Sequence, residues 1–238
     1  MLAVKGISIG IPRSVAAEHF QLFPHSEIEV RRESLPTLEA SRFILEHSHG
    51  DLVWHVTIDE LHESKMFASD DLPLFVRTLE ENSPERHTLV LAFDRTAEYD
   101  AKILDQIEAF RDSVTSIPVL LDTEHPSWKS TRIQAILKSL KLPHVFLDAP
   151  NLPGIVKDAS YHTGRTAMLR CLGRNSRTVF EHKKEIRFEY SYTNEELRTI
   201  SKRVKQLRQV YDKVFVTFCN RPGEQAIQNS IQFSGFLA

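Results

Sequence analysis

Six short apolar runs in the sequence each end on a residue that can carry charge or form hydrogen bonds. These residues are Glu29, His55, Asp94, Asp122, Asp148 and Arg170. In a parallel β/α fold the interior of a strand is apolar because both of its faces are covered. The carboxyl end of the strand opens instead toward the crevice where ligands bind. We therefore expect these side chains to converge on one face of the protein.

Carboxylates and histidines dominate this set and define its candidate chemistry. The predicted catalytic residues are Asp122, Asp148, Glu29 and His125. Oxygen and imidazole groups from several strands can bind a divalent metal, exchange protons without a metal, or form structural hydrogen bonds at the rim. No close-spaced ligand motif decides among these, so the cofactor is unknown and a divalent metal stays an open alternative. We expect Asp122 and Asp148 to open onto one pocket within reach of Arg170.

A second group of residues is suited to holding an anion. Arg170 and Arg174 flank Gly173. The two guanidinium groups could hold the oxygen atoms of an anion by paired hydrogen bonds, and the glycine would let the backbone approach that anion closely. Asn220 and Arg221 follow the last predicted strand and could complete the pocket, since TIM-type barrels often bind phosphate after strands seven and eight. The alternative is that Arg170 pairs with one of the two aspartates inside the barrel.

Eight strand-like runs alternate with helical patterns and would position these residues. The runs are Val4–Ile9, Glu27–Val30, Asp51–Val56, Thr88–Phe93, Pro118–Leu121, His144–Leu147, Ala167–Cys171 and Val214–Phe218. Alternation without an internal break predicts a parallel sheet, and eight repeats predict an α/β fold of the TIM-type (β/α)8 barrel class. We expect one barrel domain over residues 1–238, irregular in its N-terminal units because the spacings there are tight.

The charge of the chain is small overall but unevenly distributed. The formal net charge is −2, whereas residues 165–221 contain 14 Lys and Arg against 6 Asp and Glu. On the predicted helix from Asn194 to Tyr211, four of the basic residues form either a solvated face or a phosphate-contact surface, namely Lys202, Arg203, Lys205 and Arg208. An anionic small molecule is the expected partner, and nucleic acid is an alternative.

The remaining composition argues for a cytoplasmic protein. Cys171 and Cys219 are too few for a disulfide framework, and the first ten residues lack the pattern of a signal peptide. No apolar run approaches the length of a membrane span, so we expect no membrane partner. The sequence does not determine the oligomeric state.

Several segments, in the same order along the chain, resemble one known family. They are HPSW at 125–128, LDAP at 147–150, LRCLGRN at 169–175 and the long stretch from Phe188 to Ser230. Gly10 and EIEVRRESLP at 27–36 agree more weakly. Together they resemble the family called domain of unknown function 72, or YecE-like, most specifically in the second half of the chain. The resemblance implies a TIM-type barrel and no settled biochemical role.

The sequence also departs from that family and is similar to a divergent, shortened member. The resemblance implies a Gly-Thr-Ser-Gly-Trp-like turn after the first strand, where this chain has Gly-Ile-Pro-Arg at 10–13. It also implies an Arg at the position of Glu124 and a His at the position of Leu172. It also implies an Asn pair where the chain has Cys219 and Asn220, and a Gln near residues 91–94.

Three functions are compatible with these observations. The first is an enzyme acting on an anionic or phosphorylated substrate at the carboxyl-terminal barrel face. The second is a nucleic-acid-binding or metal-dependent nuclease-like barrel, which rests on the basic C-terminal segment and on analogy of fold. The third is a non-catalytic binding protein that has lost the residues of the family.

Overall fold

Eight parallel strands form a barrel in the computed structural model, which describes residues 3–14, 23–31, 34–48, 50–58, 71–93, 95–153, 155 and 161–237. The strands are β2 (Ile7–Pro12), β3 (His25–Arg31), β4 (Asp51–Thr57), β5 (His87–Phe93), β6 (Val119–Thr123), β7 (Phe146–Asp148), β8 (Thr166–Cys171) and β9 (Lys213–Phe218). Their order is β6-β5-β4-β3-β2-β9-β8-β7. Leu121 of β6 pairs in parallel with His144, just before β7, and so brings the two ends of the sheet together. The predicted TIM-type barrel is confirmed.

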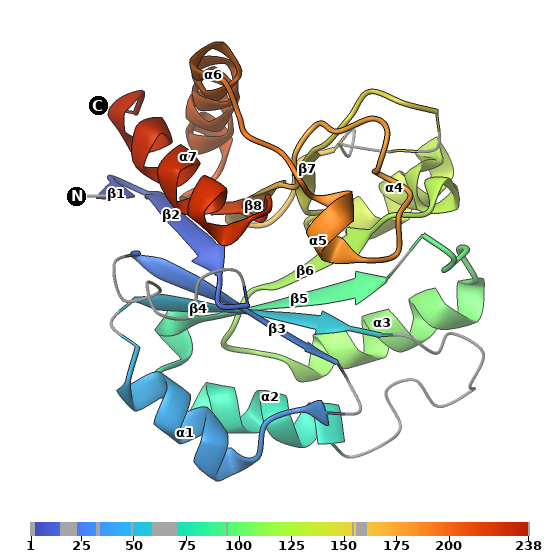
Figure 1. Ribbon diagram of the computed structural model, residues 1–238. Helices are drawn as coiled ribbons and strands as arrows, with labels where there is room; N and C mark the ends of the chain where they lie inside the picture. Colours follow the sequence, from blue (N-terminus) through green and yellow to red (C-terminus); the bar gives the residue numbers. More distant parts are fainter. Residues whose placement is uncertain are drawn as a thin grey trace.

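Helices connect most of these strands and cover the outside of the barrel. They are α1 (Leu38–Glu46), α2 (Asp71–Glu81), α3 (Ala101–Ser113), α4 (Thr131–Ser139), the short α5 (Lys184–Arg187), α6 (Asn194–Val210) and α7 (Gly223–Gly235), with the 3-10 turns η3 (Pro84–Arg86) and η4 (Pro126–Lys129). Figure 1 shows α1, α2 and α3 below strands β3 to β6, and α6 and α7 together at the other side of the barrel. Within the described residues no helix is both long and apolar enough to cross a membrane.

The N-terminal strand differs from its prediction. The apolar pattern predicts a strand over Val4–Ile9, whereas the barrel strand β2 begins at Ile7 and the preceding β1 (Ala3–Val4) pairs with it antiparallel. Gly6 lies between the two strands with φ of 77°, in the left-handed region that glycine adopts readily. The chain therefore reverses inside the run that was predicted as one strand.

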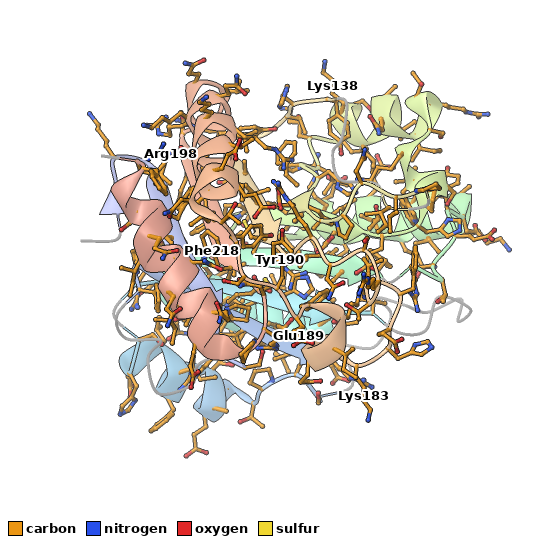
Figure 2. The ribbon with its side chains drawn as sticks, turned by 45° about the horizontal axis from the view of Figure 1, so that its top comes forward. Lys138, Lys183, Glu189, Tyr190, Arg198 and Phe218 are labelled. Carbon is orange, nitrogen blue, oxygen red and sulfur yellow. The ribbon has the colours of Figure 1, made fainter. Side chains whose placement is uncertain are left out.

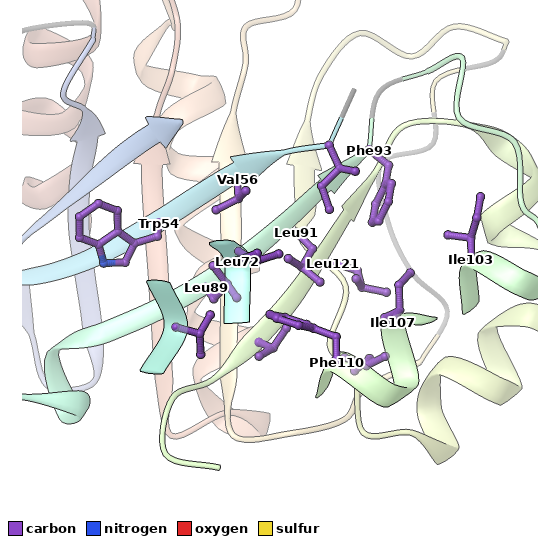
Figure 3. Close-up of a cluster of buried hydrophobic side chains, with 14 of the residues drawn as sticks. Trp54, Val56, Leu72, Leu89, Leu91, Phe93, Ile103, Ile107, Phe110 and Leu121 are labelled. Atoms are coloured by element: carbon purple, nitrogen blue, oxygen red, sulfur yellow. The ribbon is translucent and has the colours of Figure 1, made fainter. Parts of the chain in front are cut away.

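Side chains that point outward from the strands pack against the helices. Figure 3 shows Trp54 and Val56 of β4 and Leu89 and Leu91 of β5 in a cluster with residues of α2 and α3. A second cluster joins β2, β8 and β9 to α6 and α7. Burying these apolar surfaces is the main favourable contribution to the fold.

Side chains at the alternate positions point into the barrel. Val53 of β4, Val90 of β5, Met168 of β8 and Phe215 of β9 form a separate apolar cluster there. Because side chains on a strand alternate between its two faces, residues two positions further along also point inward. This places His55, two residues after Val53, in the barrel interior.

Candidate functional site

A group of ionisable side chains lies in the barrel interior near the carboxyl ends of the strands. We call it the ionic cluster; it consists of Glu27 and Glu29 of β3, His55 of β4, Asp122 of β6 and Arg170 of β8. Glu29 pairs with His55 in the parallel register of β3 and β4. All members except Glu29 are buried. Charges removed from water in this way need partners within the protein.

Arg170 joins the three carboxylates. Its Nη2 donates to Oε1 of Glu27 at 2.7 Å and to Oε1 of Glu29 at 3.3 Å, and its Nη1 donates to Oδ2 of Asp122 at 3.0 Å. Burial opposes the charge, but the neighbouring anions, Glu27 foremost, outweigh it and raise the pKa of Arg170 well above its ordinary value. Arg170 is thus paired with an aspartate inside the barrel, and its binding of an external anion stays a prediction.

His55 and Asp122 form a further contact within the ionic cluster. His55 Nε2 donates to Asp122 Oδ2 at 3.1 Å. Burial favours the neutral form of Asp122, but the hydrogen bond from His55 and the charge of Arg170 outweigh it and hold the pKa of this carboxyl well below its usual range. Among the described residues, no hydrogen-bond partner reaches four buried atoms of the cluster: Glu27 Oε2, Asp122 Oδ1, His55 Nδ1 and Arg170 Nε.

Burial shifts two further histidines, His25 and His144, toward the neutral form. His25 forms hydrogen bonds with Ser8 Oγ at 3.1 Å and Thr217 Oγ1 at 2.9 Å. Burial, together with a nearby lysine, lowers the pKa of His25 and that of His144 to about 3. Gly10 of β2 lies against His25, and a Cβ at Gly10 would be 2.5 Å from the His25 carbonyl oxygen and 2.6 Å from its Nε2. A glycine at position 10 therefore makes room for the His25 ring.

Asp148 belongs to a different network. Leu147 packs inside the barrel, so Asp148, the next residue of β7, points to the opposite side. Arg174 Nε and Nη2 donate to its two carboxylate oxygens at 2.8 and 2.7 Å, and Tyr192 Oη donates to Oδ1 at 3.0 Å. Arg174 Nη1 also reaches Oε1 of Glu196, in the first turn of α6, at 3.4 Å. This network joins the end of β7 to α6.

The structure therefore separates the two aspartates that the sequence analysis paired. Asp122 contacts Arg170 inside the barrel, whereas Asp148 contacts Arg174 on the outer side of the barrel wall. The expectation of one shared pocket within reach of Arg170 is wrong. Side chains alternate between the two faces of a strand, and Asp122 falls at an inward position of β6 whereas Asp148 falls at an outward position of β7. The catalytic roles assigned to Asp122 and Asp148 stay predictions.

An open cavity of about 730 Å³ lies over the carboxyl ends of β3 to β6. We call it the mouth cavity. Its polar lining includes Glu29, Arg31 and Thr57 at strand ends and Arg95, Glu124 and Arg187 from the segments that follow β5, β6 and β8. Ser14 Oγ donates to Glu29 Oε2 at 2.7 Å. Glu29 is thus the member of the ionic cluster that reaches the mouth cavity.

The segment that follows β8 contributes Arg187 to the mouth cavity and holds a second arginine of the cavity, Arg95. Arg187, at the end of α5, donates from Nη2 to Glu124 Oε2 at 2.6 Å. Arg95 donates to the Phe180 carbonyl oxygen at 2.9 Å and lies over the Phe180 ring. Figure 2 labels Lys183, just before α5, and Glu189 and Tyr190, which lie between α5 and α6. Sequence reasoning missed these arginines because they lie outside the apolar runs.

A smaller, mainly apolar pocket adjoins the mouth cavity. Arg95, Glu124 and Arg187 line both spaces. The walls of the smaller pocket include Leu172 and Phe180, and we call it the apolar pocket. A ligand in the mouth cavity therefore has apolar surface beside its polar contacts.

The remaining predicted catalytic residue, His125, caps a 3-10 turn. Its Nδ1 accepts a hydrogen bond from the Ser127 backbone N–H at 3.2 Å at the start of η4. Its Nε2 lies 3.9 Å from Oε1 of Glu98. These contacts give His125 a structural role at the end of β6, and its catalytic role stays a prediction.

The predicted anion ligands after β9 hold the chain between α5 and α6. Asn220 is fully buried, and its Nδ2 donates to the Tyr190 carbonyl oxygen at 2.8 Å and to Asn229 Oδ1 at 3.0 Å. The Arg221 backbone N–H donates to the Phe188 carbonyl oxygen at 2.7 Å. Anion binding by Asn220 and Arg221 stays a prediction.

The basic residues of α6 are divided between two environments. Arg203 donates to the Leu147 carbonyl oxygen at 3.1 Å, and Arg208 donates to the carbonyl oxygens of Lys5 and Tyr211 at 3.2 and 2.8 Å. Lys202 and Lys205 are exposed. Half of the predicted basic face thus binds the protein's own backbone, and contact with nucleic acid stays a prediction.

Comparison with known proteins places the chain among barrels of this kind. The profile of the family described as "Protein of unknown function DUF72" matches residues 52–238. The chain belongs to this family. No curated protein sequence matches it.

Solved DUF72 structures share the fold. A DUF72 family protein from Thermotoga maritima MSB8 superposes with a TM-score of 0.78 at 22% identity, covering 97% of this chain and 98% of that one. A DUF72 family protein from Enterococcus faecalis V583 gives a TM-score of 0.80 at 19% identity and covers 98% of both chains. In this DUF72 member, Glu124 and Leu172, where the sequence resemblance implied Arg and His, line the apolar pocket.

Proposed function

We propose that this DUF72 protein is an enzyme that acts on an anionic small molecule in the mouth cavity, with the reaction centred on Glu29. The observation that carries the proposal is the position of Glu29, which lines the mouth cavity and also joins the ionic cluster through Arg170. In barrels of this class the active site lies at this end of the strands. A carboxylate there either exchanges a proton with the substrate or holds a metal ion that activates water.

The arginines of the mouth cavity support an anionic substrate. Arg31, Arg95 and Arg187 come from the ends of three different strand units and line the same space. Guanidinium groups bind carboxylate and phosphate through paired hydrogen bonds. Arg187 is paired with Glu124, so a bound anion would compete with that carboxylate for this guanidinium.

The apolar pocket adds a second requirement for the substrate. Because Arg95, Glu124 and Arg187 line both spaces, an anionic group in the mouth cavity would have its remaining atoms beside Leu172 and Phe180. Binding sites for small molecules commonly combine apolar walls with a few placed polar groups. We therefore propose a substrate that joins an acidic group to an apolar or aromatic part.

We also propose a cytoplasmic location. Cys171 and Cys219 are buried free thiols. Free thiols are typical of reducing compartments, where disulfides seldom form.

Phenyl phosphate, which has both an acidic group and an aromatic ring, tests binding. We expect it to raise the melting temperature of the protein and to bind with a dissociation constant measurable by calorimetry. In Arg95→Ala the affinity should fall about tenfold or more, because a charge-assisted contact is worth about 1.5–3 kcal/mol. Arg77→Ala, on the exposed face of α2, is the matched control and should bind like the wild type. Equal affinity in Arg95→Ala and the control would refute the anion site.

A panel of phosphate and carboxylate monoesters tests catalysis. Glu29→Gln keeps the shape of the side chain but removes its charge. It should retain phenyl phosphate binding and lose turnover by about 100-fold or more, the usual contribution of a positioned acid or base. Turnover that is unchanged in Glu29→Gln, or absent in the wild type over the whole panel, would remove the assignment.

A further inference from the structure

We propose that Glu27, Glu29 and His55 bind a divalent cation inside the barrel, directly beneath the mouth cavity. One ligand atom from each of the three residues can be chosen so that all lie within 4.8 Å of one another. Ligands that share one ion at bond lengths of about 2.0–2.5 Å lie up to about 4–5 Å apart. The site therefore needs only small side-chain adjustments to close on an ion. The inference deepens the proposed function by naming the group that Glu29 holds, and its binding test does not require turnover.

The charge of the ionic cluster favours a cation. Glu27, Glu29 and Asp122 are three carboxylates, and Arg170 is the one guanidinium that pairs with all of them. The side chain of Glu27 is fully buried, and those of Asp122 and Arg170 are about as inaccessible. Within this set the three carboxylates outnumber the one guanidinium by two. Buried charge of this kind is costly unless it is paired or bound to a metal.

Buried atoms without partners point to the position of the ion. Among the described residues, nothing donates a hydrogen bond to Glu27 Oε2, and His55 Nδ1 has no hydrogen-bond partner. Buried polar atoms are normally satisfied in folded proteins, and the binding of an ion is one of the reasons for an exception. Both atoms belong to the residues whose ligand atoms come together.

The contacts around the three residues resemble the outer shell of a metal site. Asp122 Oδ2 accepts from His55 Nε2, which places the ring hydrogen on Nε2 and leaves the Nδ1 lone pair available. Such carboxylate–histidine pairs orient the imidazole ligands of metals. Arg170 binds Oε1 of both glutamates and so fixes their orientation. Asp122 and Arg170 are therefore positioning residues in this proposal.

The donor set defines the class of ion. Two carboxylates and one imidazole suit first-row divalent ions such as Mn²⁺ and Zn²⁺ better than soft ions that prefer thiolates. Glu29 borders the mouth cavity, so water or a substrate oxygen can complete the coordination from that side. A site with three protein ligands and one open position is the arrangement found in catalytic metal centres.

Calorimetric titration of the chelator-treated full-length protein with MnCl₂ and ZnCl₂ tests the site. We expect one ion per chain in the wild type and at least tenfold weaker binding in Glu27→Gln and His55→Gln. Glu108→Gln, on the exposed face of α3, is the control and should bind as the wild type does. Unchanged affinity in both cluster variants, or no binding by the wild type at millimolar metal, would overturn the proposal.

Spectroscopy of the wild type keeps the test decisive if a variant does not fold. Electron spin echo spectra of bound Mn²⁺ should show nitrogen modulation from one imidazole ligand, and a spectrum without nitrogen would refute the assignment of His55. The two proposals can fail separately. The wild type could bind Mn²⁺, with binding lost in Glu27→Gln, and yet turn over none of the tested esters. That combination would support the metal site and count against the proposed enzyme.

Discussion

Replacement of Arg170 by methionine is expected to destabilise the protein strongly. The substitution keeps an unbranched side chain of similar length but removes the donors to Glu27, Asp122 and Glu29. The side chain of Glu27 is 0% exposed and that of Asp122 is 5% exposed, so both carboxylates would be left in the barrel without their cation. Removing one partner of a buried ion pair costs about 3–5 kcal/mol. This is a large part of a total stability of about 5–15 kcal/mol.

Urea unfolding followed by tryptophan fluorescence measures this loss, because Trp54 and Trp128 are both fully buried. A chelator should be present so that no cation neutralises the stranded carboxylates. Arg165→Met is the matched control. Arg165 pairs with Asp212 at the surface, where the two side chains are 87% and 59% exposed, and its loss should cost no more than about 1 kcal/mol.

The pH dependence gives a second, independent signature. In the wild type the depressed pKa of Asp122 contributes stability above the unfolded pKa and loses it as the pH falls through the folded value. In Arg170→Met the charge of Arg170 no longer offsets the burial of Asp122, and only the contact with His55 still does, so the pKa of Asp122 should rise. Protonation of this carboxyl should then remove part of the cost of burying it. The stability difference between the two proteins should therefore shrink on acidification. A variant within about 1 kcal/mol of the wild type at neutral pH would refute the argument.

Two further predictions concern the buried residues His25 and His144 and the glycine that packs against His25. Gly10→Ala should cost about 1–3 kcal/mol in urea unfolding, because the added Cβ would overlap His25, whereas Gly235→Ala should show no such loss since nothing lies within 4 Å of its Cβ position. The pKa of His25 and that of His144 are lowered to about 3, so the unfolded chain binds these protons first as the pH falls below about 6.5. The free energy of unfolding should therefore fall between about pH 6.5 and 3, by up to about 1.4 kcal/mol per pH unit for each histidine. If its slope against pH is the same in His25→Gln as in the wild type, the reasoning is contradicted.

The local sequence pattern determined most of the barrel. Each of the eight predicted runs coincides with or overlaps a barrel strand, and the strand that departs most is β2, where the Gly6 turn interrupts an apolar stretch. The helix from Asn194 ends one residue before the predicted boundary, and it begins with a capping box between Thr193 and Glu196. These features depend on periodicity and on contacts between neighbours in the chain, which a sequence records directly.

The sequence also contained part of the site. Glu29, His55, Asp122 and Arg170 were singled out because each follows an apolar run, and the structure brings all four together. Glu27 was missed, although its spacing of two from Glu29 within a strand predicts that both point to the same face.

Tertiary structure alone decided which of these groups meet. Asp122 and Asp148 have the same local pattern, and only closure of the barrel shows that one faces its interior and the other faces α6. Arg170 contacts Glu27 across a separation of 143 residues in the sequence. The mouth cavity is formed by segments that follow different strands, and the apolar periodicity of the sequence does not show that these segments meet. Strand alternation is a local property of the backbone, whereas the partner of each inward-facing charge is set by the order and register of strands that are distant in sequence.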